Sequence, residues 1–191
     1  MTILLGRALY VRSASGQEAP DQAREVLAAE NRPAPDTIED RLVELMKAYE
    51  KPIYNFLVVL LHDNDCALDC AQDCFLRAFQ NLAKGRPVNR SWLYTVARNL
   101  AMDEFRKRKH VQRDLDELEK IPCGEHMDRV VAVRQVMEQL TPRDREVLYL
   151  FDVAGFKTDE IGHMLGARGS AIRQRLCRAR ERFRALYGAE L

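Results

Sequence analysis

Apolar residues recur at intervals of three and four through most of the chain after Thr37, which is the periodicity of helices buried on one side. No run alternates apolar and polar residues over the length that a half-buried strand requires. Clusters of Pro and Gly interrupt the periodicity and separate one expected helix from the next. The pattern therefore predicts an all-α fold built from several packed helices.

Charge is sorted along the chain even though its total is close to zero. With 30 Lys and Arg against 29 Asp and Glu, the formal net charge of the 191 residues is +1. By segment, residues 37–76 carry −5, residues 77–110 carry +7, residues 111–128 carry −4 and residues 129–191 carry +4. Sorting of this kind indicates separate acidic and basic surfaces that suit different partners.

The length permits one ordinary domain or two small ones, and the breaks in the pattern favour two. Residues 1–36 hold one weak amphipathic stretch and are expected to form a poorly ordered N-terminal extension. Helical domains are expected over residues 37–110 and 129–191. Residues 111–128 are acidic and contain a Pro and a Gly, which is typical of a linker. The predicted fold class is thus two small helical domains joined by an acidic linker.

Pro and cap residues set the expected helix boundaries in the first domain. Helical periodicity begins at Thr37, and Pro52 is expected to break it before a second helix. A third helix is expected over residues 65–83. Ser91 is expected to cap a fourth helix that runs to about residue 109.

The helix expected over residues 65–83 has two unlike sides. A rotation of about 100° per residue places one broad apolar face on Ala67, Leu68, Ala71, Cys74, Phe75, Ala78 and Phe79. The opposite face carries Asp65, Asp69, Gln72, Asp73 and Gln80. An acidic outer face should repel DNA, so it suits a basic protein partner.

The fourth helix differs because its polar side is largely basic. That side carries Arg98, Asn99, Asp103, Arg106, Lys107, Arg108 and Lys109. Two aromatic residues, Trp92 and Tyr94, lie near the start of the same helix. Basic groups combined with aromatic rings and an Asn suit a nucleic-acid strand whose bases are unstacked.

The second domain ends in the pattern of a helix-turn-helix. A helix expected over residues 158–165 is followed by a tight turn at residues 166–169 and a last helix that runs to about Tyr187. Gly162 is small enough to let the two helices approach closely. The last helix has one continuous inner stripe of Ile172, Leu176, Ala179, Phe183 and Leu186.

Arginine is concentrated on the outside of that last helix. Seven Arg and one Glu lie between residues 168 and 184. A guanidinium group can bind a phosphate or the O6/N7 edge of guanine with two parallel hydrogen bonds. The helix therefore has the pattern of a recognition helix in a major groove, and the alternative is that its arginines only solubilise an exposed surface.

Four stretches of the sequence carry a family resemblance in the same order. They are DCAQDCFLRAF at residues 69–79, WLYTVARNLAMDEFR at 92–106, LTPRDREVL at 140–148 and LCRAR at 176–180. Over residues 37–187 the chain resembles the extracytoplasmic-function (ECF) family of bacterial RNA polymerase sigma factors. The resemblance implies an initiation factor that binds core RNA polymerase and gives it promoter specificity, while the polymerase performs the catalysis.

The same resemblance implies roles for three groups of residues. The polymerase-binding positions are Asp69, Gln72 and Asp73. The positions that open and hold the minus-10 DNA are Asn99, Asp103, Arg106 and Lys107, and Arg98 on the same basic side is a further candidate. The positions that read the minus-35 duplex are Arg173, Gln174, Cys177 and Arg178. Arg168 and Ser170, which differ from the residues usual in the family, are further candidates because they lie at the start of the same helix.

The implied partners are core RNA polymerase and promoter DNA, with an anti-sigma factor as a further candidate. The alternative function is a helix-turn-helix DNA-binding regulator that does not act as a sigma subunit. An enzyme is not indicated, because the sequence holds no phosphate loop, nucleophile elbow or metal-ligand cluster; no catalytic residue, metal or cofactor is expected.

The longest strongly apolar run, residues 53–61, is far shorter than the roughly 20 residues of a membrane span. We therefore expect no membrane insertion and a cytoplasmic protein. The chain also has five Cys, an odd number that does not suit a disulfide framework.

Three of the cysteines recur every four residues after His62, at Cys66, Cys70 and Cys74. Helical residues eight apart are separated by about 12 Å along the axis, which is too far for one metal ion to bind both. Packing as small buried hydrophobes is the favoured interpretation of these cysteines, and metal or thiol sensing is the alternative.

Overall fold

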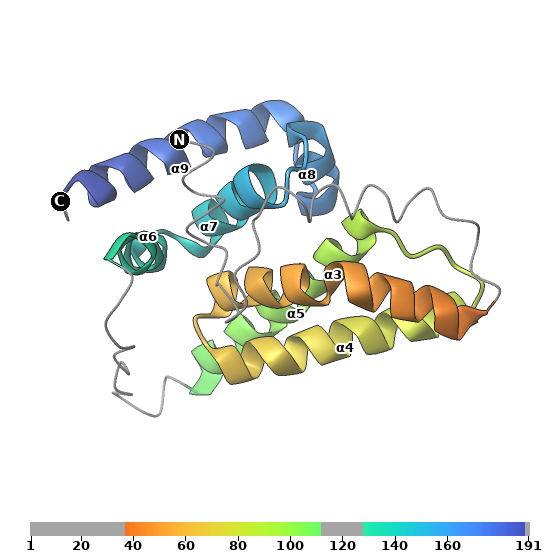
Figure 1. Ribbon diagram of the computed structural model, residues 1–191. Helices are drawn as coiled ribbons and strands as arrows, with labels where there is room; N and C mark the ends of the chain where they lie inside the picture. Colours follow the sequence, from red (N-terminus) through yellow and green to blue (C-terminus); the bar gives the residue numbers. More distant parts are fainter. Residues whose placement is uncertain (1–36, 112–127, 190–191) are drawn as a thin grey trace.

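The computed structural model describes residues 37–111 and 128–189, and these ranges contain helices and no strand (Figure 1). The first group is α3 (Ile38–Leu61), α4 (Asn64–Ala83) and α5 (Arg90–Val111). The second group is α6 (Asp128–Gln139), α7 (Pro142–Leu148), the π-helical turn η1 (Tyr149–Val153), α8 (Thr158–Leu165) and α9 (Gly169–Ala189). The all-α prediction is confirmed. The N-terminal extension and nearly all of the acidic linker lie outside the described residues.

The helices α3 and α4 lie side by side and run in opposite directions (Figure 1). Thr37 begins α3, because its hydroxyl accepts a hydrogen bond from the Asp40 amide at 3.1 Å. His62 ends it in the left-handed region, with φ of 55°. Asp63 then caps α4 by accepting from the Cys66 amide at 2.9 Å. The tight connection between α3 and α4 therefore follows from one left-handed residue, His62, and one side-chain cap, Asp63.

The expected break at Pro52 is wrong, because α3 continues through this residue as one helix. Proline removes one backbone hydrogen bond from a helix interior. Ile53, Phe56 and Leu57 directly follow the proline, and each is fully buried. We infer that burial of this apolar turn outweighs the lost hydrogen bond.

The start of α5 also differs from the prediction. The side chain of Asn89, and not that of Ser91, accepts the cap hydrogen bond from the Trp92 amide, at 2.9 Å. Asn and Ser both make this bond, so sequence alone does not separate two candidates two residues apart. The Ser91 carbonyl instead accepts from the Thr95 hydroxyl at 2.7 Å.

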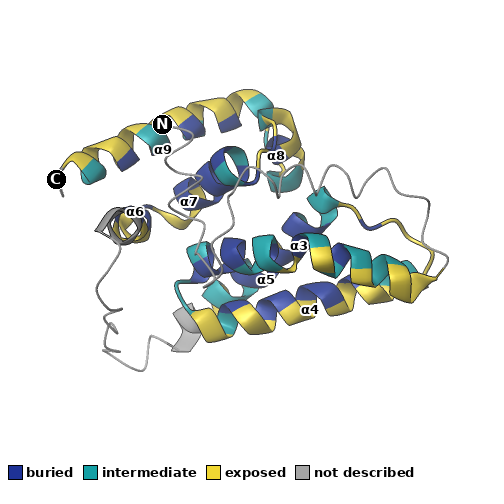
Figure 2. Ribbon diagram, viewed as in Figure 1, coloured by how far each residue is buried: buried dark blue, intermediate teal, exposed yellow. Residues whose placement is uncertain are grey.

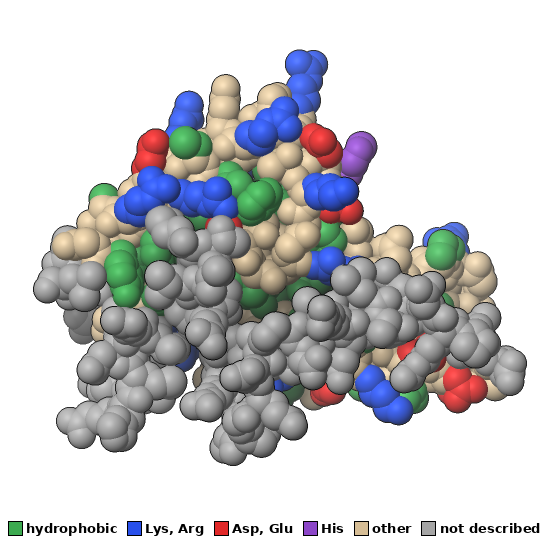
Figure 3. Space-filling view, turned by 45° about the horizontal axis from the view of Figure 1, so that its top comes forward, with side chains coloured by type: hydrophobic (Ala, Val, Ile, Leu, Met, Phe, Trp, Pro, Cys, Tyr) green, Lys and Arg blue, Asp and Glu red, His purple; other side chains and the backbone are tan. Residues whose placement is uncertain are grey.

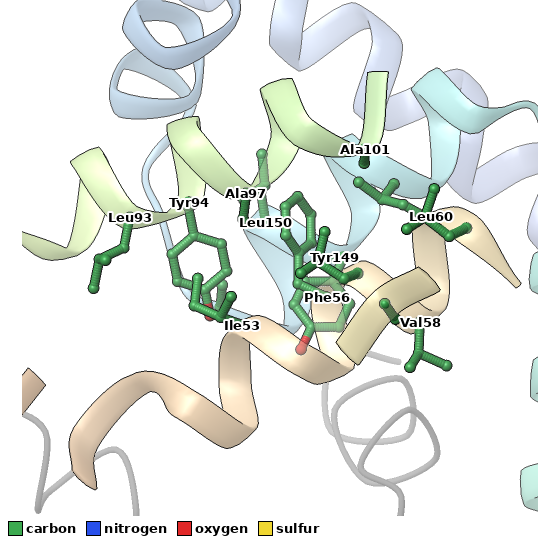
Figure 4. Packing of buried hydrophobic residues seen from close by; sticks show 14 of the residues in the cluster. Ile53, Phe56, Val58, Leu60, Leu93, Tyr94, Ala97, Ala101, Tyr149 and Leu150 are labelled. Carbon is green, nitrogen blue, oxygen red and sulfur yellow. The ribbon is translucent and has the colours of Figure 1, made fainter. Parts of the chain in front are cut away.

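The two helical groups share one apolar core. Tyr94 of α5 packs edge-on against Phe156 at a ring-centroid distance of 5.1 Å, and Phe56 of α3 contacts Tyr94 at 5.3 Å and Tyr149 at 5.2 Å. Figure 4 shows Phe56, Tyr94 and Tyr149 pointing toward one another from three segments. The Tyr149 hydroxyl also donates to the Pro52 carbonyl at 3.2 Å. In this conformation the two groups therefore pack directly against each other.

Exposed side chains gather on the outer sides of α4 and α9 (Figure 2). On α4, Ala67, Cys74 and Phe75 are buried as expected, but Leu68 is 49% exposed and Phe79 is 37% exposed. The prediction that these two residues join the buried face is wrong. Both lie at the edge of the apolar arc, where the distance to α3 and α5 decides burial.

None of the helices in residues 37–111 and 128–189 combines the length and the hydropathy that crossing a membrane requires.

Candidate nucleic-acid and protein interfaces

The helices α8 and α9 form the predicted helix-turn-helix. Gly166 ends α8 in the left-handed region with φ of 64°, a conformation that glycine adopts without strain. A Cβ atom on Gly162 would lie 2.6 Å from the Ala167 carbonyl oxygen and 3.3 Å from the Gly169 nitrogen. The prediction that Gly162 permits a close approach is confirmed, because any side chain there would press against the backbone of the turn.

The inner stripe of α9 anchors this helix to the rest of the second group. Ile172, Leu176, Ala179 and Phe183 are buried, and Leu186 is half-buried. Phe183 stacks on Tyr187 with 5.8 Å between ring centroids. A helix fixed along one side in this way holds the opposite side in a constant orientation.

All six predicted minus-35 residues lie on the exposed side of α9 or in the turn before it: Arg168, Ser170, Arg173, Gln174, Cys177 and Arg178. Arg173 lies 4.0 Å from Asp159 and 3.4 Å from the Thr158 hydroxyl, and it is still 62% exposed. The Cys177 thiol lies 3.6 Å from a Glu181 carboxylate oxygen. Figure 3 shows Lys and Arg side chains spread over the surface that α8 and α9 form.

Two arginines of α9 stabilise the fold instead. Arg180 forms an ion pair with the buried Asp152 and lies over the Phe151 ring at 5.1 Å. Arg182 forms an ion pair with Asp144, which is also buried. The concentration of arginine on this helix therefore serves two purposes, and only the outward-facing members are available to a phosphate or a base.

The basic side of α5 contacts the second group through Arg98. The Nε of Arg98 donates to a Glu146 carboxylate oxygen of α7 at 2.7 Å, and the Glu146 side chain is only 2% exposed. Burial raises the pKa of Glu146, and the neighbouring Arg98 opposes that rise. Among the predicted minus-10 residues, Arg98 is thus part of an internal ion pair.

The other predicted minus-10 residues lie farther along the exposed side of α5. Asn99 is exposed and its side-chain oxygen accepts from Arg98 at 3.2 Å. Arg106 pairs with Asp103 at 2.6 Å, one helical turn away. Lys107 pairs with Glu104 at 2.9 Å, and the hydrogen bond to this carboxylate raises the pKa of Lys107. These short-range pairs are solvent-exposed, so a competing phosphate can replace them at little cost.

The predicted polymerase-binding residues Asp69, Gln72 and Asp73 are all exposed on α4. A hollow of about 290 Å³ separates this face from α5. Its lining residues are Cys66, Asp69, Cys70, Asp73, Arg77, Leu100, Asp103, Glu104 and Lys107. The structure thus brings two predicted polymerase-binding carboxylates next to two predicted minus-10 residues.

The cysteines of α4 are thiols in an apolar setting. Cys70 and Cys74 are buried, and burial raises the pKa of Cys70 to about 11 and that of Cys74 to about 12. The Cys74 thiol donates to the Leu93 carbonyl at 3.5 Å. Within the described ranges, no group of three or more His, Cys, Asp or Glu is arranged to hold a metal ion. Raised pKa values of this kind make both thiols poor nucleophiles at neutral pH.

The sequence analysis did not identify the acidic residues that form ion pairs with these arginines. Asp144, Glu146 and Asp152 are buried and pair with three arginines from α5 and α9. The sequence offered one signal, since these acids lie among buried apolar residues at positions where a solvated acid does not fit. Their partners are 28 to 48 residues away, so spacing alone could not identify them.

Two family models of the sigma-70 class match the chain, one over each of the two helical groups. Residues 45–111 match Sigma-70 region 2, and residues 131–183 match Sigma-70 region 4. The first match covers the helices with the acidic and basic sides, and the second covers the helix-turn-helix.

Similarity to sigma factors with known names identifies the family of this chain. The chain is 30% identical to the RNA polymerase sigma factor YlaC of Bacillus subtilis over 159 residues, which cover 76% of this chain and 88% of YlaC. It is 28% identical to the ECF sigma factor SigM of the same organism, covering 75% of this chain and 93% of SigM. The chain is 25% identical to the ECF sigma factor SigE of Mycolicibacterium smegmatis over 152 residues. These residues cover 74% of this chain and 59% of SigE. The chain belongs to the ECF family of RNA polymerase sigma factors.

Two solved structures share the fold. The sigma factor RpoE of Bartonella quintana, in complex with the anti-sigma factor NepR, matches with a TM-score of 0.61 and 20% identity over 88% of this chain and 97% of RpoE. CnrH in complex with the cytosolic domain of CnrY matches with a TM-score of 0.61 and 21% identity, over 90% of this chain and 99% of CnrH.

Proposed function

We propose that this protein binds core RNA polymerase and directs initiation at a particular set of promoters, reading the minus-35 duplex and opening the minus-10 DNA. The observation that carries the proposal is the presence, in one chain, of an exposed arginine face on a helix-turn-helix and an exposed acidic face on a region 2 helix. The two faces have opposite charge, so they suit two different partners.

The minus-35 role belongs in this proposal to the outer side of α9. Arg178 lies on the exposed side of α9, away from the buried stripe that packs against the rest of the protein. Its guanidinium group can form two parallel hydrogen bonds with the edge of a guanine. Arg173 and Gln174 flank it on the same exposed side. A recognition helix needs this combination of a fixed inner face and long polar side chains outside.

The minus-10 role belongs to the exposed side of α5. Asn99 can hydrogen-bond a base edge, while Arg106 and Lys107 can neutralise phosphates of an unpaired strand. Asp69, Gln72 and Asp73 on α4 would bind a basic surface of the polymerase. The hollow between α4 and α5 supports an arrangement in which polymerase and melted DNA meet at neighbouring positions.

The family relationship supports two further parts of the proposal. Initiation takes place where the bacterial genome is transcribed, so we place this protein in the cytoplasm. Both solved neighbours come from complexes, one with an anti-sigma factor and one with the cytosolic domain of CnrY, so an anti-sigma factor is a candidate partner of this chain as well. The activity requires no chemistry by this chain, since the polymerase forms the phosphodiester bonds.

A helix-turn-helix regulator without sigma activity is the less favoured function. Such a regulator has no use for the acidic face of α4 or for a region 2 segment over residues 45–111. It would bind duplex DNA alone, whereas a sigma factor directs synthesis only together with core polymerase.

The decisive experiment is reconstitution with bacterial core polymerase, followed by run-off transcription and mapping of start sites across genomic DNA. We expect start sites that share minus-10 and minus-35 elements and that disappear when this protein is omitted. Asp69→Arg should reduce the affinity for core polymerase by about tenfold or more, because it reverses a contact charge. Glu50→Arg, a charge reversal at an exposed position of α3, is the matched control. Unchanged binding by the Asp69 variant would remove this residue from the polymerase surface, and absence of any directed synthesis would exclude sigma activity.

A further inference from the structure

The outer face of α4 exposes more apolar surface than a solvated helix needs. Five large hydrophobic side chains are exposed in the described residues, and three of them lie on this helix. Leu68 is 49% exposed, Leu76 is 54% exposed and Phe79 is 37% exposed. Single exposed hydrophobes are common on protein surfaces, but several on one helical face indicate a docking surface.

These three side chains lie along one side of α4 and form a seam that also carries Asp65 and Gln72 and has an acidic edge. At about 100° per residue, Leu68, Phe79 and Leu76 fall within about 80° of one another around the helix axis. Asp69 and Asp73 follow directly on one side of this seam, and both are exposed. A ligand of α4 should therefore combine apolar side chains with positive charge.

The beginning of this chain has that combination. Residues 1–15 contain Arg7 and Arg12 and no acidic residue. They also contain seven large apolar side chains: Met1, Ile3, Leu4, Leu5, Leu9, Tyr10 and Val11. The first acidic residue is Glu18, so residues 1–15 combine positive charge and apolar side chains without any acidic residue, whereas the rest of the extension mixes both charges.

The connection to the folded part is long enough for this segment to reach all of α4. The 21 residues between Ser15 and Thr37 span at most about 70 Å when extended and about 25 Å on average as a flexible chain. The 20 residues of α4 are about 30 Å long. A tether of this length gives an effective concentration on the order of a millimolar, so a weak contact is sufficient for substantial occupancy.

We propose that residues 1–15 dock in cis on the apolar and acidic outer face of α4 and there compete with core polymerase. The docking part of the proposal rests on the opposite charges of the two segments, on their exposed apolar side chains and on the length of the connection between them. The competition additionally rests on the proposed function, because it requires that polymerase binds the same face. The extension then reduces the affinity for polymerase until a partner or a proteolytic cut removes it from α4.

A second copy of this chain is a poorer occupant of the same face. A symmetric contact through α4 would bring Asp69 and Asp73 toward the same carboxylates of the other copy, and like charges across an interface oppose association. The basic N-terminal segment meets no such repulsion.

The docking is tested on the full chain without polymerase. A photo-crosslinking benzophenone amino acid replaces Tyr10, and crosslinked peptides are mapped by mass spectrometry. We expect crosslinks within one chain to residues 64–83, reduced at least fivefold by Arg7→Glu with Arg12→Glu and by increased salt. Crosslinks to other helices, crosslinks between chains, or none above the background of unfolded protein would overturn the proposal.

The competition is tested by the affinity of the full chain for core polymerase. The variant with Arg7→Glu and Arg12→Glu should bind about five- to tenfold more tightly than the unchanged chain. The matched control is Arg24→Glu with Arg32→Glu, which makes the same charge change in the extension outside residues 1–15 and should leave the affinity unchanged. Equal affinities of all three proteins would exclude competition. Failure of all three to bind polymerase would contradict the proposed function and leave the crosslinking result to decide the docking.

Discussion

The basic surfaces of α5 and α9 use arginine in different ways. On α9, Arg178 and its neighbours project into solvent from a helix that is anchored on its opposite side. On α5, Arg98 is 29% exposed and donates to the buried Glu146 of the second helical group. The difference shows that a count of basic residues does not measure how much of a surface is available to nucleic acid.

The contact through Arg98 also links the two halves of the molecule. Glu146 is buried on α7, which packs against α3 and α9, and its carboxylate accepts from Arg98 of α5. The outer side of α9, the predicted minus-35 surface, is exposed in this conformation, whereas Arg98, a predicted minus-10 residue, is engaged by Glu146. Variants of Arg98 and Arg178 test this contrast directly, and variants of Gly162 and His62 test the packing that holds the two helical groups in place.

Arg98→Ala should have the largest effect, a loss of about 3 kcal/mol in the free energy of unfolding, because it removes the hydrogen-bonded cation that pairs with the buried Glu146 carboxylate. Arg178→Ala should change the same quantity by less than about 0.5 kcal/mol. Urea denaturation of both variants measures the difference. Arg98→Leu combined with Glu146→Leu should recover most of the loss, since an apolar pair replaces a buried ion pair at little cost. Equal effects of the two single variants would show that Arg98 is no more structural than Arg178.

Gly162→Ala should cost about 2 to 3 kcal/mol, because the new Cβ would lie 2.6 Å from a backbone oxygen of the turn, where no flexible side chain can move aside. Gly188→Ala is the matched control in the same domain, since a Cβ there meets no atom within 4 Å. This variant should be neutral or stabilise α9 by up to about 1 kcal/mol. Thermal unfolding of both proteins gives the comparison, and similar melting temperatures would contradict the close packing of α8 on α9.

Arg178→Ala should weaken binding of holoenzyme to its own promoter by about 1 to 3 kcal/mol, if this arginine reads a base. Binding to a duplex with a scrambled minus-35 element should change much less. Arg143→Ala, which removes an exposed arginine at the start of α7, is the control for loss of general charge. Competition assays on both duplexes measure the effect, and equal losses on both would assign Arg178 to the phosphate backbone.

His62→Asn should have the smallest effect and should appear only as a change in pH dependence. Burial, together with Arg145 and Arg134, lowers the pKa of His62 from 6.5 to about 4, although the Glu138 carboxylate lies 3.8 Å from Nδ1. The folded state therefore binds fewer protons than the unfolded state between these pH values, so stability falls as pH decreases through this window.

Asn tolerates the left-handed conformation of position 62 and does not titrate. We expect the variant to lose less stability than the unchanged protein between pH 6.5 and pH 4, measured by urea denaturation at each pH. Parallel pH profiles of the two proteins would show that His62 is not held neutral by its surroundings.

The helical class and the helix-turn-helix could be predicted because both depend on local spacing. Helix caps are equally local: Thr141 begins α7, because its hydroxyl accepts a hydrogen bond from the Asp144 amide at 3.3 Å. The inner stripe of α9 repeats over four turns, and such a repeat indicates a helix that is buried along one side. The outward direction of the predicted minus-35 residues follows from that stripe without further information.

Other features depend on contacts between distant segments and could not be predicted. The exposure of Leu68 and Phe79 depends on how closely α4 packs on its neighbours, and the continuity of α3 through Pro52 depends on burial of the next turn. The partner of Arg98 is 48 residues away on another helix. Periodicity describes one helix at a time, so it assigns a face but not the group that contacts it.

The π-helical turn Tyr149–Val153 lets one short segment serve two neighbours. Its wider turn, with the Ala154 amide bonded to the Tyr149 carbonyl at 2.8 Å, has the geometry of one residue added to an α-helix. Tyr149 faces the aromatic core while Asp152 faces Arg180 of α9. Removing one residue from this turn would rotate the helical residues that follow it within the same segment by about 100°. The extra residue therefore determines which side chains of this segment meet the aromatic core and which meet α9.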